Sequence, residues 1–176
     1  MAHHTLKSGY SQLVERLNRF PQGAPPSEAL YGILKILFGE REAELVSLLP
    51  IKPFTVDKAA RAWKMPRAEA QKVLEELAGR AILIDIEQDG EMEYVLPPPM
   101  AGFFEFSLMR VRGDIDQKAL SELFYQYLNV EEDFVRELFT CGETQLGRVF
   151  VHEPVLSNEN ALHVLDYERA SEVIKT

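Results

Sequence analysis

The stretch ILIDIEQDGEMEYVL, residues 82–96, decides the fold because it predicts a β-hairpin. Isoleucine alternates with acidic residues over positions 84–87, which is the two-residue period of a strand with two different faces. Asp89-Gly90 follows, and this dipeptide favours a tight turn between antiparallel strands. We therefore expect two short strands that pair with each other.

Two helices are predicted immediately before the hairpin, in TVDKAARAWKMPRAEAQKVLEELAGR (residues 55–80). Met65-Pro66 separates them, and proline suits the first position of the second helix. Apolar residues at helical spacing give each helix one inward face: Val56, Ala59, Ala60 and Trp63 in the first, and Ala70, Val73, Leu74, Leu77 and Ala78 in the second. The order helix, turn, helix and hairpin is that of a winged helix, a fold that usually binds DNA.

The whole chain is predicted to be mainly α, with the hairpin as a small β wing. Residues 1–25 form an N-terminal helix and a proline-rich linker, residues 26–99 the winged helix-turn-helix domain, and residues 100–176 a helical region. Ser27 is expected to cap the helix that follows it, and Thr55 and Asn129 are expected to cap later helices. A strand is predicted over 147–155.

The last helical pattern, residues 162–174, has no stop signal before the end of the chain. We therefore expect that a longer protein continues past Thr176. Hydrophobic content of 46% and charged content of 27% are typical of a globular protein. No apolar run approaches the roughly 20 residues of a membrane helix, and no signal peptide is recognisable. With one cysteine, Cys141, these features favour the cytoplasm and no membrane contact.

The net charge of −9 is unevenly distributed along the chain. Residues 52–80 hold seven basic and four acidic residues, whereas residues 81–176 hold seven basic and 19 acidic residues. The hairpin itself carries five carboxylates and no lysine or arginine. Since DNA binding depends on neutralising phosphates, an acidic wing argues against it.

The second helix of the pair nevertheless offers Arg67, Gln71 and Lys72 as candidate DNA contacts. Glu69, Glu75 and Glu76 on the same helix offset the positive charge of Arg67 and Lys72. A winged helix that serves as a scaffold or protein-docking module therefore explains the pattern better than DNA recognition.

No recognisable active site emerges from the remaining residues. Cys141 has no base or metal-binding neighbour, so a structural thiol is the better interpretation. The Arg-Gly-Asp tripeptide at 112–114 is best explained by chance, and the aromatic residues over 103–106 are expected in a core or an interface. An enzyme whose site is dispersed through the sequence stays open as an alternative.

Three segments resemble one protein family: VLPPPMAGFFEFSLMR (95–110), ELFYQYLN (122–129) and HVLDYERASEVIK (163–175). They are similar to the N-terminal region of bacterial and archaeal ferredoxin-type iron–sulfur proteins. The resemblance implies a cysteine-rich part beyond Thr176 that binds [4Fe–4S] clusters. It assigns no cluster ligand within this chain, and Cys141 matches no ligand position.

The leading hypothesis is a non-catalytic N-terminal scaffold or docking region of a [4Fe–4S] ferredoxin-type electron-transfer protein, with no cluster bound by this chain. The expected partner is a redox protein or another basic protein, or a second copy of the chain, and DNA is disfavoured. The alternative is a winged-helix transcription regulator that uses Arg67, Gln71 and Lys72.

Overall fold

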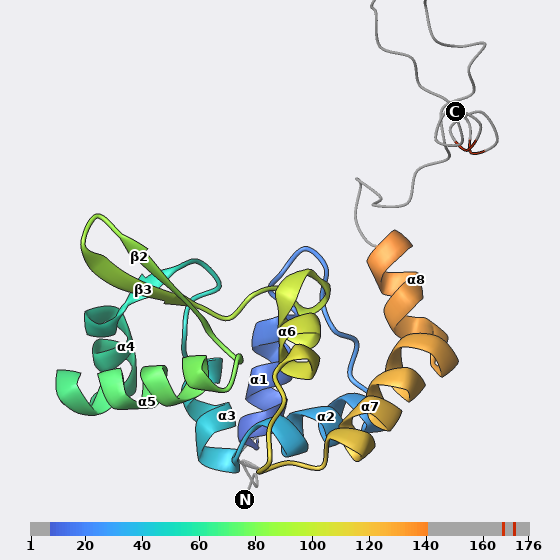
Figure 1. The fold of residues 1–176 in the computed structure, drawn as a ribbon, viewed down its shortest axis with the longest axis horizontal. Helices are drawn as coiled ribbons and strands as arrows, with labels where there is room; N and C mark the ends of the chain where they lie inside the picture. The colour runs from blue at the N-terminus through green and yellow to red at the C-terminus, as the bar shows by residue number, and fades with distance from the viewer. Residues whose placement is uncertain (1–7, 141–166, 168–170, 172–176) are drawn as a thin grey trace, which may run out of the picture.

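The computed structural model describes residues 8–140, Tyr167 and Ser171, and it is mainly helical with one small antiparallel sheet (Figure 1). The strand predicted over 147–155 lies outside the described residues, as does the helix over 162–174 except for Tyr167 and Ser171, which are helical. The helical elements in chain order are α1 (Gly9–Leu17), α2 (Glu28–Leu37), α3 (Glu40–Ser47), α4 (Val56–Trp63), α5 (Arg67–Gly79), the wide turn η1 (Pro99–Phe103), α6 (Phe104–Met109), α7 (Gln117–Tyr125), the wide turn η2 (Gln126–Val130) and α8 (Glu132–Thr140).

The sheet has three strands in the order β1-β3-β2: β1 (Phe54–Thr55), β2 (Ile84–Gln88) and β3 (Glu91–Val95). The predicted hairpin is confirmed, and both turn residues, Asp89 and Gly90, have positive φ angles of 53° and 79°. A tight turn that follows the twist of its strands requires this conformation, which glycine adopts without steric cost. The two-residue strand β1 is not predicted by the sequence.

The pairing register gives the hairpin two different faces. Tyr94 lies opposite both Phe54 and Asp85, so these three side chains share one face. Phe54 and Tyr94 are buried there. The opposite face carries Ile84 and Ile86, and the Ile86 side chain is 45% exposed. Burial on the first face is therefore confined to Phe54 and Tyr94, since Asp85 on the same face is exposed, and the other face carries two partly exposed isoleucines.

Helices α4 and α5 form the predicted pair with a sharp turn between them. Lys64 ends α4 in the left-handed region, at a φ of 53°. Pro66 immediately precedes α5, one position earlier than predicted, because the helix begins at Arg67. Leu74 and Leu77 are fully buried, as their spacing predicts.

A buried cluster of apolar side chains extends from Leu13 in α1 to Phe134 in α8. Phe104 occupies its aromatic centre, with ring centroids 5.1–6.0 Å from Phe103, Phe124, Tyr127 and Phe134. Phe103 and Phe104 therefore lie in the core, as the sequence predicts, whereas Phe106 is partly exposed. In Figure 1, the helix pair and hairpin lie at one end of the described part and α7 and α8 at the other.

Cap positions follow the sequence only in part. Ser27 caps α2 as predicted, and its hydroxyl accepts a hydrogen bond from Leu30 N at 3.1 Å. Thr55 stands at the predicted cap position of α4, but its side chain makes no capping hydrogen bond. The prediction for Asn129 is wrong: it lies inside η2, and α8 begins at Glu132. In the described ranges, no helix is both long and apolar enough to cross a lipid bilayer.

Candidate functional site: the helix pair and the acidic hairpin

The structure brings two of the three candidate DNA contacts together on α5. Arg67 Nε donates to Asp57 Oδ1 of α4 at 3.0 Å, and Arg67 Nη1 donates to Gln71 Oε1 at 3.4 Å. Gln71 Nε2 in turn donates to Glu75 Oε1 at 2.8 Å. Lys72 is exposed on the same helix. Arg67 and Gln71 are thus connected to two carboxylates of the protein itself.

A second basic group was missed by sequence reasoning. Arg61 and Lys64 line an open hollow of about 600 Å³ at the end of α4, together with Asp57, Ala60 and Met65. Their spacing of three residues on the polar side of α4 was the available signal. Arg61 Nε donates to the Asp57 backbone oxygen at 3.2 Å, which fixes this side chain along its own helix.

The hairpin presents its acidic side chains to solvent. Asp85, Glu87, Asp89 and Glu91 are exposed, and Glu93 is half-buried. No lysine or arginine occurs between residues 81 and 109. The charged side chains of the hairpin are therefore all negative, and they lie next to a helix pair of mixed charge.

Two neighbouring hollows lie where the start of β2 meets the end of α5. One, of about 230 Å³, is mainly apolar and is lined by Ala78, Ala81, Leu83, Ile84, Asp85 and Phe106. The other, of about 280 Å³, is lined by Glu75, Ala78, Gly79, Asp85, Tyr94 and Arg110. They share Ala78 and Asp85, so they adjoin. Burial, followed by the charges of Glu75 and Asp85, raises the pKa of Tyr94.

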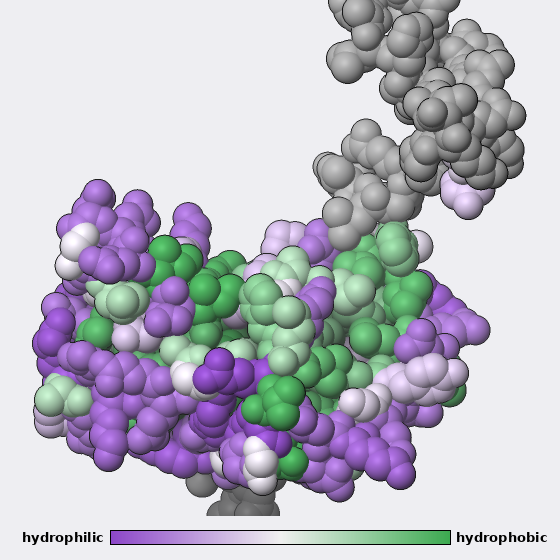
Figure 2. Space-filling model, in the orientation of Figure 1, coloured by the Kyte–Doolittle hydropathy of each residue, from purple (hydrophilic) through white to green (hydrophobic). Residues whose placement is uncertain are grey.

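Apolar surface lies next to these hollows. Figure 2 shows a hydrophobic area that extends from the foot of the hairpin across α6 toward α8. The exposed large apolar side chains on η1 and α6 are Met100, Phe106, Leu108 and Met109. Apolar patches rimmed by charged residues are typical of interaction sites.

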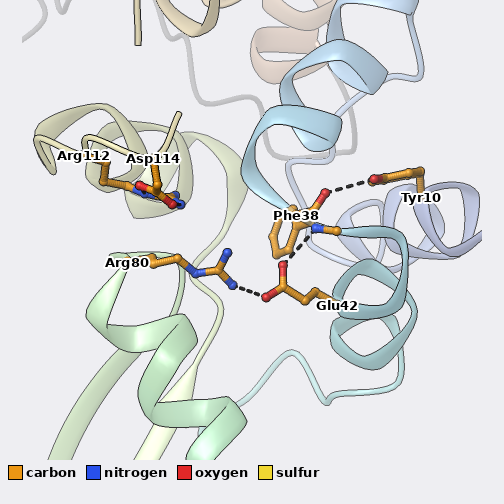
Figure 3. Close-up of polar contacts among 7 residues, drawn as sticks. Tyr10, Phe38, Glu42, Arg80, Arg112 and Asp114 are labelled. Atoms are coloured by element: carbon orange, nitrogen blue, oxygen red, sulfur yellow. Dashed lines mark hydrogen bonds and ion pairs between the residues drawn. The ribbon is translucent and has the colours of Figure 1, made fainter. Parts of the chain in front are cut away.

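A further polar cluster joins elements that are distant in the sequence (Figure 3). Arg80, at the end of α5, pairs with Glu42 of α3. Arg112 donates from Nε and Nη2 to the two carboxylate oxygens of Asp114, at 2.9 and 2.5 Å. This bond is the main cause that lowers the pKa of Asp114. The Arg112 side chain is only 6% exposed, so the Arg-Gly-Asp tripeptide does not offer its guanidinium to a receptor.

The buried Arg16 of α1 was not singled out by the sequence. Its Nε donates to the Leu49 backbone oxygen at 3.0 Å, and its Nη2 donates to that of Pro50 at 2.6 Å. Burial lowers its pKa to about 10. These hydrogen bonds connect α1 to the residues that follow α3, so Arg16 has a structural role.

The residues present do not fit a [4Fe–4S] cluster. Such a cluster typically takes four cysteine thiolates, and the chain has one cysteine, Cys141, which lies outside the described residues. Within residues 8–140, no three His, Cys, Asp or Glu side chains lie close enough together to hold a metal ion.

Comparison of the chain with protein-family models, curated proteins and solved structures gives no match to any of them.

Proposed function

We propose that the chain is a non-catalytic, winged-helix docking region of a [4Fe–4S] ferredoxin-type electron-transfer protein of the cytoplasm. The winged-helix assignment is supported by the order β1, α4, α5, β2, β3, in which β1 pairs with β3. In this arrangement α5 takes the place of the recognition helix, and the β2–β3 hairpin takes the place of the wing.

The exposed acidic hairpin is the observation that carries the docking role. Its carboxylates would lie beside the phosphates of any duplex held by α5, and like charges repel at this range. A protein surface of opposite charge would instead be attracted and oriented by the same carboxylates. Arg67 and Gln71, which DNA recognition would require, are already bonded to Asp57 and Glu75.

The iron–sulfur part of the proposal rests on the resemblance of segments 95–110, 122–129 and 163–175, of which the first two lie within residues 8–140. In the structure these two segments form η1, α6 and the α7–η2 region, which supply Phe104, Phe124 and Tyr127 to the aromatic core. The cluster would reside in a part of the protein beyond Thr176, where its chemistry would be one-electron transfer. This chain would contribute partner binding.

Reconstitution tests that assignment. The 176-residue chain and the product of its complete gene would each be incubated anaerobically with iron and sulfide. We expect the chain to stay colourless and the longer product to turn brown, with about four iron atoms per cluster. A gene product that ends at Thr176, or that continues without grouped cysteines, would show the iron–sulfur assignment to be wrong.

The transcription-regulator alternative has one observation in its favour. Arg61, Lys64 and Lys72 are exposed on the helix pair, and such groups can contact phosphates. DNA binding by the intact chain therefore distinguishes the regulator from the docking region.

A further inference from the structure

The two adjoining hollows at the foot of the hairpin combine an apolar and an acidic environment. β2 is an edge strand of the sheet, and the hollows lie at its start, against the last turns of α5. A ligand along this edge would therefore meet both environments at once.

The apolar hollow is lined by a buried leucine and a partly exposed phenylalanine. Leu83 is buried beneath it, and Phe106 is 38% exposed at its side. The Phe106 ring packs close to Gly102, where an added Cβ would lie 3.0 Å from a ring carbon. Gly102 thus lets the ring approach the η1 backbone and fixes the wall of the hollow. An aliphatic side chain of a ligand would find apolar contacts here.

The acidic hollow begins at Asp85 and extends to Glu75 on α5. Both carboxylates are exposed, and the remaining hairpin carboxylates lie further along the same strands. Arg110 also lines this hollow, so its own lining carries one net negative charge. The hairpin adds to that charge, which favours a cation over an anion.

We propose that this pair of hollows is the docking site for a basic segment of a partner protein, with an apolar side chain in the first hollow and a neighbouring lysine or arginine between Asp85 and Glu75. The inference rests on the proposed docking function and specifies its site and its partner chemistry. The hairpin carboxylates beyond Asp85 would steer the segment toward the hollows.

Three synthetic peptides of about 15 residues, or four helical turns, serve as probes. The first places leucine and lysine on adjoining helical faces, the second replaces lysine with glutamate, and the third replaces leucine with serine. Binding is followed by fluorescence anisotropy, and the site by amide and methyl shifts in NMR spectra of the full chain. We expect only the first peptide to bind and to shift Leu83, Ile84 and Asp85.

Two pairs of variants with matched controls locate the site. Phe106→Ser should weaken binding of the first peptide about tenfold. Phe139→Ser, at a similarly exposed phenylalanine of α8, is the control and should change the affinity by less than about twofold. Asp85→Asn with Glu75→Gln should also weaken binding of the first peptide about tenfold. Glu122→Gln with Asp133→Asn is the control, because both carboxylates are also exposed but lie outside the two hollows.

Ala78→Lys provides an independent test if Phe106→Ser loses its fold. Ala78 lines both hollows, and lysine is a good helix former, so the change adds a repelling charge at the proposed site. Ala78 is partly buried against the core, so a thermal melt of the variant has to show that it is still folded. We expect the folded variant to lose binding of the first peptide, and unchanged binding by a folded variant would overturn the site.

The outcomes separate this site from the general docking function. Shifts confined to the hairpin tip, with no effect of Phe106→Ser or Ala78→Lys, would overturn the site but retain an acidic docking surface. Equal binding of the lysine and glutamate peptides would overturn the partner chemistry. Absence of binding to the first peptide, together with binding of duplex DNA, would overturn both.

Discussion

Arg67 Nε on α5 lies 3.0 Å from Asp57 Oδ1 on α4, which joins the first turns of the two helices. Both side chains are more than half exposed, at 60% and 58%. Exposed ion pairs of this kind contribute only about 0–1 kcal/mol to folding. The pair therefore matters mainly because it neutralises the arginine that a DNA-binding helix would present.

The ion pair between Arg67 and Asp57 should contribute little to stability, because both side chains are exposed. A double-mutant cycle of Arg67→Ala and Asp57→Asn should give a coupling free energy of about 0.2–1 kcal/mol in urea melts. The cycle cancels the separate effect of Asp57 on the α4 dipole. Raising the salt concentration should reduce the coupling, because both groups are exposed. A coupling above about 2 kcal/mol would mean that the pair is far less accessible than its exposure indicates.

Leu74 tests the packing of the helix pair. Leu74→Ala should lower the free energy of unfolding by about 2–5 kcal/mol, because it removes a fully buried side chain and leaves a cavity. Glu76→Ala, at an exposed position of the same helix, is the control and should change it by less than about 0.5 kcal/mol. A similarly small loss for Leu74→Ala in denaturant melts would contradict the packing of α5.

Gly102 tests the turn that positions Phe106. Its φ angle is +133°, and an added Cβ would lie 2.8 Å from Pro97 Cβ. Gly102→Ala should therefore destabilise the fold by about 1–3 kcal/mol. Gly79→Ala is the matched control, because its Cβ would meet nothing within 4 Å at the end of α5. That change should be neutral or stabilise by up to about 1 kcal/mol. Equal effects of the two substitutions in thermal melts would contradict the geometry of η1.

The bond between Arg112 and Asp114 predicts a pH dependence. Because Arg112 lowers the pKa of Asp114 in the folded chain below the ordinary 3.8, the carboxylate stabilises the fold above that pH. The contribution is lost as pH falls through the lowered value. The stability difference between wild type and Asp114→Asn should thus be constant from neutral pH to about 5 and shrink below 4. A difference that grew on acidification would contradict the assignment.

The local elements that the sequence predicts well are those fixed by short-range chemistry. Asp89-Gly90 specifies the hairpin turn, Ser27 specifies the start of α2, and the spacing of Leu74 and Leu77 specifies the buried face of α5. β1 could not be predicted in the same way, because two residues are too few to show alternation. Asn129 failed as a cap because α7 continues through η2 past it.

The sequence predicts several residues of the candidate site but not the contacts that they make. The exposed carboxylates of the hairpin and the positions of Arg67 and Gln71 follow from periodicity. Their bonding does not, since Asp57 approaches Arg67 from another helix. The hollows depend on Phe106 meeting residues 78–85, a contact that arises only when α6 packs beside the hairpin.

Duplex DNA binding by the intact chain tests the docking role most directly. A random duplex would be titrated with micromolar protein at physiological salt in a gel-shift assay. The control is a hairpin variant in which Asp85, Glu87, Asp89 and Glu91 are changed to the corresponding amides. We expect no shift with the wild-type chain, because its hairpin repels the phosphates, and a measurable gain for the variant. A wild-type shift that weakens with Arg67→Ala or Lys72→Ala would contradict the docking role and favour a DNA-binding regulator.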